Sequence, residues 1–282
     1  MNKLVRKAMS CALAFSAMFA SVGMMTACET KNPNVEMVIE FEEKTYTLEY
    51  KLYRKITPAT VDHFLALVEN GYYNDICIHD YDTSDLRMYT GAYKYVEGEE
   101  NGGIVYQQYY DIVKGYKNFP CSVWSDTSKT EARYNLYGEF AENGVYVGDE
   151  SDSGSLSEAF GSLVMYYTPK DCADKVAIYN EYKDKMELKG YQYNSATSMF
   201  GISLSKTEKK NSEYCTFATL TEDSEDEFEA LVDAIAENDD FTTEYEVDVD
   251  RDDDFVKDQR NKISYKVPNK PIVIKSMKVT KY

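Results

Sequence analysis

The chain has little histidine, little tryptophan and few basic residues for its length. Its 282 residues include 2 histidines and 1 tryptophan, and 31 Lys and Arg stand against 49 Asp and Glu, for a formal net charge of −18. With only His63 and His79 available, a histidine-rich metal centre or a Ser-His-Asp hydrolase is hard to build, so we predict neither a metal nor another cofactor. A surface this acidic repels phosphate backbones, which argues against nucleic acid as a partner.

The first 27 residues are typical of a secretory signal. Lys3, Arg6 and Lys7 precede a largely apolar run over residues 8–25. The run ends in Met25-Thr26-Ala27-Cys28, which resembles a bacterial lipobox with Met in place of the usual Leu. This predicts that residues 1–27 are removed, that Cys28 is lipidated, and that residues 28–34 tether the protein to the extracytoplasmic face of the bacterial cell membrane. The alternative is a single transmembrane anchor in which Cys28 has no role.

The remaining cysteines do not define a disulfide framework. Cys77, Cys121, Cys172 and Cys215 contain no CxxC pair. Export permits a disulfide, but this spacing does not require one and names no partners. The oligomeric state is equally open.

Residues 35–282 are predicted to form one domain, because 43 % of the chain is hydrophobic and its elements follow one another closely. Alternation predicts two strands at 35–41 and 46–53, joined by a polar hairpin turn at 42–44. Thr57-Pro58 begins a helix that ends at Asn70-Gly71. Ser224 begins a second helix, with Glu227 completing a capping box. Further strands are predicted at 161–167, 200–204, 214–220 and 271–279.

Two helices among many strands favour a mainly β fold, a closed or nearly closed barrel capped by the helices. Three segments fit this scheme less well and are predicted to be insertions, at about 94–133, 169–190 and 237–262, because none has enough apolar residues for a core of its own. The first could hold a helix around Val105 to Val113 and the second a helix around Val176 to Tyr182. In the third, Asp248, Asp250 and Asp252 alternate as in a calcium loop, but the required glycine and glutamate are absent, which favours a solvated acidic loop.

Residues 57–74 read TPATVDHFLALVENGYYN and resemble the first helix of the cyclophilin-type peptidyl-prolyl isomerases, P-x-T-V-x-N-F-x-x-L-x-x-x-G-Y-Y. Other blocks follow in family order. They resemble F-H-R at Ile78-His79, F-M-x-Q-G-G at 88–91, G-E-F at Gly138-Glu139-Phe140, G-x-L-S-M at 161–165, S-A-G-S-Q-F-F at 195–200 and K-H-V-V-F-G at 213–218. The resemblance implies a closed eight-stranded barrel with two capping helices, and an activity on proline-containing peptides.

The resemblance also implies where ligand contacts should lie. An isomerase lowers a rotation barrier of about 18–20 kcal/mol, and in the family an arginine does so by donating toward the prolyl nitrogen. On this sequence the arginine position is Asp80, an acceptor. Other positions also depart from the family pattern. Arg87 replaces the apolar residue before Met88, and Thr90 and Met199 replace the two glutamines. Gly201 replaces a phenylalanine, a residue at about Lys209 replaces the tryptophan, and Tyr214 replaces the histidine. Phe64, Leu65, Met165, Phe200 and Phe217 match the positions that pack the barrel.

The predicted site residues follow from this mapping. Arg87 is the candidate catalytic residue, because the segment from His79 to Thr90 is about two residues longer than in the family and a reshaped loop could bring its guanidinium over the groove. The other interpretation is an exposed arginine on a polar loop. His79 is interpreted as a packed or hydrogen-bonded histidine and His63 as a solvated one. The candidate substrate-binding residues are Met88, Thr90, Met165, Tyr167, Met199, Phe200 and Tyr214.

Three functions remain as hypotheses. The leading one is an exported, membrane-tethered cyclophilin-like protein with weak or no isomerase activity that binds proteins or peptides. The alternative is an active foldase for exported proteins, with a site rebuilt around Arg87 and Met88. A solute-binding lipoprotein fits less well, since such proteins usually need two lobes and the chain offers one barrel. The 26 tyrosines could contribute to binding peptides or sugars, or reflect the preference of tyrosine for strands.

Overall fold

The computed structural model describes residues 32–140, 143, 156–166, 175–180, 183–190, 197–210, 214–248 and 262–282. The predicted signal, the lipidation site Cys28, the site residue Tyr167, Cys172, and Asp250 and Asp252 all lie outside the described residues. Asn32 to Lys281 group as one unit of mutual contacts. Among the described residues, no helix is both long and apolar enough to span a bilayer.

The main sheet is antiparallel and begins with the predicted hairpin. Strand β1 (Asn34–Phe41) pairs with β2 (Lys44–Leu52) in continuous register around a two-residue loop. Alternate residues point into the core, where Val35, Met37, Ile39 and Phe41 of β1 and Tyr46, Leu48, Tyr50 and Leu52 of β2 are buried. The alternation in the sequence therefore predicts both the strands and their buried face.

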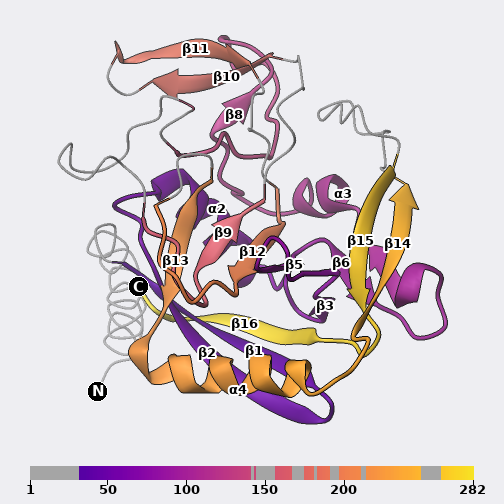
Figure 1. Ribbon diagram of the computed structural model, residues 1–282. Coiled ribbons are helices and arrows are strands. Elements are labelled where there is room, and N and C mark those ends of the chain that lie inside the picture. The colour runs from indigo at the N-terminus through magenta and orange to yellow at the C-terminus, as the bar shows by residue number, and fades with distance from the viewer. Residues whose placement is uncertain are drawn as a thin grey trace, which may run out of the picture. The chain divides into compact units, whose positions relative to one another are not determined.

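Nine further strands join the main sheet (Figure 1). They are β3 (Ile76–Cys77), β4 (Asp80–Asp82), β5 (Arg87–Thr90), β6 (Tyr93–Tyr95), β7 (Ile104–Tyr106), β9 (Leu163–Met165), β12 (Phe200–Ser203), β13 (Thr216–Leu220) and β16 (Val273–Lys281). The order across the sheet is β4-β5-β12-β9-β13-β2-β1-β16-β3-β6-β7. The mainly β prediction is confirmed, but this is a curled sheet of eleven strands. The expected count of eight is exceeded because β6 and β7 extend one edge and two residues outside the strand ladders, 78 and 79, separate β3 from β4.

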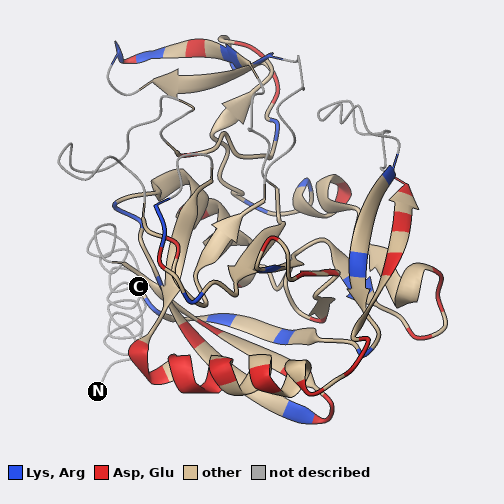
Figure 2. Ribbon diagram, in the orientation of Figure 1, with Lys and Arg blue, Asp and Glu red and all other residues tan. Residues whose placement is uncertain are grey.

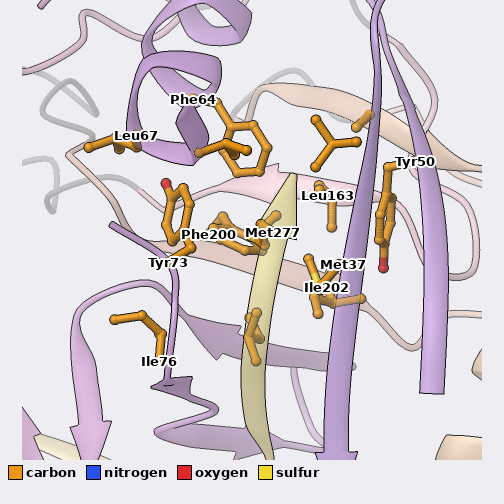
Figure 3. Close-up of a cluster of buried hydrophobic side chains, with 14 of the residues drawn as sticks. Met37, Tyr50, Phe64, Leu67, Tyr73, Ile76, Leu163, Phe200, Ile202 and Met277 are labelled. Atoms are coloured by element: carbon orange, nitrogen blue, oxygen red, sulfur yellow. The ribbon is translucent and has the colours of Figure 1, made fainter. Parts of the chain in front are cut away.

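Both predicted long helices are present, at α2 (Pro58–Glu69) and α4 (Glu225–Ala236). Phe64 of α2 packs against Tyr73 and Phe200, with ring centroids 5.2 and 5.5 Å away, in the buried cluster of Figure 3. It also packs against Phe217, with a centroid distance of 4.9 Å. Helix α4 packs on β2, and acidic residues colour its exposed turns in Figure 2. Helix α4 follows the short 3₁₀ helix η5 (Glu222–Ser224).

The helix starts differ from the sequence prediction. Ser224 makes no side-chain cap, because its hydroxyl accepts the backbone N–H of Glu49 at 2.8 Å, so the predicted capping box is wrong. Thr57 does not cap α2 either. Instead, the carboxylate of Glu139 accepts the backbone N–H groups of Ala59 and Thr60 at 3.1 and 2.8 Å and the Thr60 hydroxyl at 2.7 Å. A residue distant in sequence thus satisfies the free donors of this helix.

Two smaller sheets contain the rest of the described strands. One has the order β11-β10-β8, with β8 (Val123–Trp124), β10 (Lys175–Asn180) and β11 (Lys185–Gly190). The predicted helix around Val176 and Tyr179 is therefore wrong, because strand pairing buries Val176 beside Val123 and Tyr137. The helix expected around Val105 to Val113 is only α3 (Tyr109–Val113), and Val105 lies in β7 after the 3₁₀ turn η1 (Asn101–Gly103).

The second small sheet is a hairpin of β14 (Thr242–Asp248) and β15 (Lys262–Pro268). The insertion predicted at about 237–262 therefore includes the strand β14, whose last residue is Asp248, the first aspartate of the expected acidic loop. Its inward side chains alternate with acidic ones, and this alternation was masked in the sequence by the high density of Asp and Glu.

Candidate functional site

The candidate site is built on the pairing of β4, β5 and β12. Arg87 lies opposite Asp82 and Ser203, and Tyr89 lies opposite Asp80 and Gly201. Because side chains alternate along a strand, Arg87, Tyr89 and Gly201 share one face of the sheet and Met88, Thr90 and Phe200 share the other. The first face carries the charged groups and the second faces the core.

Arg87 is fully buried and paired, with 2 % of its surface exposed. Its Nε and Nη2 atoms donate to the two carboxylate oxygens of Glu158 at 3.1 and 2.7 Å, which is the bidentate geometry that suits guanidinium and carboxylate. Nη1 donates to Asp85 at 3.3 Å, and the guanidinium stands 4.6 Å from the ring centroid of Tyr214. The interpretation of Arg87 as an exposed loop residue is therefore wrong.

Glu158 is held in place by its backbone as well as by Arg87. Its N–H and C=O pair with those of Lys209 at 2.8 and 3.0 Å, and the Lys209 ammonium lies 3.8 Å from its carboxylate. Burial acts to raise the pKa of Glu158, but the hydrogen bond and charge of Arg87 outweigh it and lower the pKa. Burial likewise acts to lower the pKa of Arg87, and Glu158 outweighs it and raises the pKa. Both groups are therefore ionised as a pair.

Gly201 leaves space that Arg87 and Tyr89 fill. A Cβ atom at Gly201 would lie 3.2 Å from Cδ of Arg87 and 3.1 Å from Cε1 of Tyr89. The Tyr89 hydroxyl donates to Asp85, and burial is the first cause of its raised pKa. The ring of Tyr89 also meets Tyr166, with centroids 5.4 Å apart. The surface at Gly201 is thus covered by an arginine stem and a tyrosine ring.

Asp80 contacts the β14–β15 hairpin. Its carboxylate accepts the backbone N–H of Lys266 at 2.9 Å, and burial raises its pKa to about 6. The Lys266 ammonium donates to Asp82 at 2.7 Å. Although burial acts to raise the pKa of Asp82, its hydrogen bonds to Lys266 and Ser84 lower it to about 2. Strand β4 therefore presents hydrogen-bond acceptors that a lysine of the hairpin already occupies.

The family model for "Cyclophilin type peptidyl-prolyl cis-trans isomerase/CLD" matches residues 37–279. The chain belongs to the cyclophilin family. Similar solved structures include two of a Cryptosporidium parvum cyclophilin type peptidyl-prolyl cis-trans isomerase, the second in the presence of the dipeptide Ala-Pro. They are 15 % and 16 % identical, cover 89 % and 88 % of this chain and 99 % of their own, and have a TM-score of 0.44 in both cases. No curated protein sequence matches the chain.

Most of the substrate-binding residues expected from the cyclophilin pattern lie inside the protein. Met88, Met165 and Phe200 are fully buried in the main core. Thr90 is also buried, and its hydroxyl donates to the carbonyl of Cys77 at 2.9 Å. The two that remain partly accessible are in different surroundings: Met199 packs against the cluster beneath the β14–β15 hairpin, and Tyr214 packs beside Arg87. The structure therefore does not bring the expected set together on one open surface within the described residues.

The two histidines of this cyclophilin are both buried. His63, expected to be solvated, has its Nε2 atom 2.8 Å from the carbonyl of Thr197 and 3.1 Å from the Tyr109 hydroxyl, and burial lowers its pKa to about 4. The expectation was wrong because the rings of Tyr109 and Phe119 pack against His63 and cover it. His79 is packed, as expected, between the rings of Tyr93 and Tyr265 at centroid distances of 4.7 and 4.9 Å, and burial lowers its pKa to about 3.

Sequence reasoning missed the residues that hold Arg87 and Asp80. Glu158, Asp85 and Tyr89 belong to the Arg87 cluster, and Lys266 belongs to the hairpin. An arginine between apolar strand residues does signal a need for an acidic partner. With 49 acidic residues in the chain, that signal alone selects none of them. Among the described residues, no three His, Cys, Asp or Glu side chains gather in a way that could hold a metal ion.

Proposed function

We propose that this member of the cyclophilin family is an exported, lipid-anchored protein that binds proline-containing peptides or exported proteins and has weak or no isomerase activity. The observation that carries the proposal is the buried pair of Arg87 and Glu158. An isomerase needs a hydrogen-bond donor that is free to reach the prolyl nitrogen, in a preorganised site. Both side-chain edges of Arg87 are occupied by carboxylates, and the family's arginine position holds Asp80, which can only accept when ionised.

The alternative function is an active isomerase with a rebuilt site around Arg87 and Met88. It requires Arg87 to leave Glu158, since the guanidinium lies 2.7 Å from that carboxylate. Separating a buried ion pair leaves an uncompensated charge, which costs several kcal/mol, about 3–5. Met88 would also have to leave the core, in which it is fully buried. Both requirements count against the rebuilt site.

The experiment that separates the two is a prolyl-isomerisation assay on residues 29–282 with an Ala-Pro test peptide. Losing one preorganised donor costs roughly a hundredfold to a thousandfold in rate, so we expect a rate within about tenfold of the uncatalysed background at micromolar protein. Arg54→Ala is the matched control for Arg87→Ala, because Arg54 forms a more exposed pair with Asp62. A robust rate abolished only by Arg87→Ala, in a variant shown to be folded by circular dichroism, would establish the rebuilt site instead.

We also propose that the main sheet closes into the family's eight-stranded barrel. The segment 76–82 supplies both β3 and β4, and the two residues between these strands form backbone hydrogen bonds to different strands or their neighbours. The backbone N–H of Ile78 donates to the carbonyl of Ile272, next to β16, at 2.9 Å. The backbone N–H of His79 donates to the carbonyl of Tyr89 in β5 at 3.0 Å. If β3 and β4 are taken as one continuous strand, this strand pairs with β16 on one side and with β5 on the other. It then closes a ring with β5, β12, β9, β13, β2, β1 and β16. Slow amide exchange at both residues would support closure, and exchange as fast as in exposed loops would exclude it.

Attachment to the membrane is proposed to depend on Cys28. A lipid chain can anchor a protein whose acidic surface gains nothing from anionic headgroups. Cys28→Ser should abolish palmitate labelling and leave the unprocessed form. Persistent label in the variant, or release of the wild-type protein by a salt wash, would contradict the anchor without bearing on the isomerase proposal.

A further inference from the structure

The β14–β15 hairpin is joined to the main sheet by side chains and not by a strand ladder. Its two strands pair with each other over seven residue pairs and form a separate sheet in the described residues (Figure 1). One face is apolar and consists of Tyr245, Val247, Ile263, Tyr265 and Val267, which pack with Cys77, Ala92, Tyr93, Ile104 and Met199. The opposite face is exposed and carries Glu244, Glu246 and Lys262. This is an amphipathic arm laid over one side of the candidate site.

The base of this hairpin, at residues 240–243 and 269, and its two strands are held in place by different contacts. At the base, Asn269 makes three hydrogen bonds, each of 2.7 Å. Its backbone N–H donates to the carbonyl of Phe241 and its side-chain amide to the carbonyl of Asp240, while its side-chain oxygen accepts the Thr243 hydroxyl. Phe241 packs on Tyr81 and Phe41 at 5.5 and 5.9 Å. The base is therefore fixed to the core.

The arm is latched to β4 by one residue. Lys266 donates its backbone N–H to Asp80 at 2.9 Å and its ammonium to Asp82 and Ser84 at 2.7 and 3.1 Å. Contacts made by one half-buried lysine and by packed apolar side chains, without a shared backbone ladder, can separate at a lower free-energy cost than unfolding of the sheet itself.

The closed position of the arm also includes an unfavourable free-energy contribution, from His79. Both ring nitrogens of His79 are buried, have no hydrogen-bond partner among the residues that the structure describes, and lie directly beneath Tyr265. A buried polar group left unsatisfied is unfavourable, and water would satisfy these nitrogens if the arm lifted. The covered residues His79, Asp80 and Met199 include two positions at which the cyclophilin pattern predicts ligand contacts. The arm therefore lies where a ligand would approach.

We propose that the β14–β15 hairpin is a displaceable strap that opens on its base at Asn269 and, when latched by Lys266, covers the Asp80 and Met199 side of the candidate site. The covering of a peptide site rests on the proposed function, whereas the opening of the strap does not. An extended peptide with apolar side chains would compete for the same surface, because Tyr265 and Val267 of the strap already occupy it.

Two buried thiols make the opening measurable. Cys77 is buried beneath the strap, and Cys215 is buried in the main core. Burial raises the pKa of Cys77 to about 12, so it reacts only when uncovered. On residues 29–282, which contain the whole unit from Asn32 to Lys281, alkylation at each cysteine can be followed by peptide mass spectrometry in increasing urea. We expect Cys77 to react faster than Cys215, with a much weaker dependence on urea, because opening the strap exposes less surface than unfolding.

The latch is tested by charge reversal. Lys266→Glu places a third carboxylate beside Asp80 and Asp82 and should accelerate alkylation of Cys77 about tenfold, a change of about 1.4 kcal/mol in the opening equilibrium. Lys262→Glu is the matched control, because Lys262 lies on the same strand but pairs with Glu246 inside the hairpin at 3.3 Å. It should leave Cys77 within about twofold of the wild type. If Lys266→Glu does not fold, the urea dependence of the wild-type protein still decides the question.

The outcomes separate the strap from the proposed function. Equal rates and equal urea dependence at Cys77 and Cys215 in the wild type would overturn the strap. If the thiol results are as expected, an Ala-Pro peptide should bind more tightly to Lys266→Glu than to Lys262→Glu in calorimetry. Equal binding to both would overturn the covering of the site. Binding to neither would leave the strap established by the thiols and would contradict peptide binding as the function.

Discussion

The two faces of strands β5 and β12 carry different chemistry on the same backbone. Met88 and Phe200 follow the family pattern and are buried in the main core. Arg87 and Gly201 depart from it and share the opposite face, where an ion pair and a tyrosine ring fill the space. The inner face is determined by volume and hydrophobicity, which many sequences can satisfy. The outer face depends on specific charged partners, and there a single substitution has larger consequences.

Breaking the ion pair should have the largest effect on stability. Arg87→Leu removes the bidentate partner of Glu158, whose side chain is 0 % exposed, and leaves its buried carboxylate with the more distant Lys209 ammonium at 3.8 Å. We expect a loss of about 3–5 kcal/mol in the free energy of unfolding by urea denaturation. Arg54→Leu should cost less than about 1 kcal/mol, because the pair of Arg54 and Asp62 is more exposed.

The double variant sharpens this test. Arg87→Leu with Glu158→Leu removes both charges, and hydrophobic replacement of a buried pair is often neutral or stabilising. Most of the lost stability should therefore return. If the single variant costs no more than Arg54→Leu, then the outer face is not sealed, and Arg87 would be free to contact a ligand.

A buried and an exposed acidic residue can be compared at the two helix starts. Glu139→Ala removes the acceptor for three donors at the start of α2 and should cost about 2 kcal/mol. Glu225→Ala, in the first turn of α4, should cost a few tenths, because an exposed charge there interacts only with the helix dipole, worth about 0.3–1 kcal/mol. Equal losses in thermal unfolding would show that Glu139 does not act as the cap.

The same carboxyl makes stability depend on pH. Burial raises the pKa of Glu139 from 4.5 to about 7, so between these values the folded state holds a proton that the unfolded state releases. The contribution of the protonated form is full below about pH 4.5 and is lost as the pH rises toward 7. Glu139→Gln, which cannot titrate, should remove this dependence. The stability difference between the wild type and Glu139→Gln should therefore change between pH 4.5 and 7 and be constant outside that range.

The sequence was sufficient for the inner face and insufficient for the outer one. Period-2 alternation predicts β1 and β2 with their buried residues, and the Thr57-Pro58 start predicts α2, because these signals are local. The partner of Arg87 lies 71 positions away, and the cap of α2 lies 79 or 80 positions away. No local pattern selects one carboxylate from many at such separations. The strand β14 was missed for a related reason, since its exposed acidic residues outnumber its inward apolar residues, Tyr245 and Val247.

The two histidines should respond in opposite directions to loss of their nitrogens. His79→Phe keeps the ring between Tyr93 and Tyr265 and removes two unpartnered buried atoms, so it should raise stability by about 1 kcal/mol. His63→Phe removes the contacts with Thr197 and Tyr109 and should lower stability by about 1–2 kcal/mol. Denaturation at pH 8, where both rings are neutral, measures each value. Destabilisation by His79→Phe similar to that of His63→Phe would mean that the His79 nitrogens are satisfied.

The smallest effect is expected at the exposed turn of the first hairpin, where neither face is involved. Glu42 and Glu43 both have positive φ, 49° and 63°, in the two-residue loop between β1 and β2. This backbone is that of a turn which strongly prefers glycine or asparagine. Glu43→Gly should therefore stabilise the protein by roughly 0.5 kcal/mol, since removing the strain of a left-handed conformation exceeds the entropy lost by glycine. Glu40→Gly, in the adjoining strand, should instead destabilise by about 0.5–1 kcal/mol, because the strand gains nothing from that freedom. If both substitutions destabilise equally, the loop is not held in the left-handed region, and the register that it sets for β1 and β2 must come from their buried residues alone.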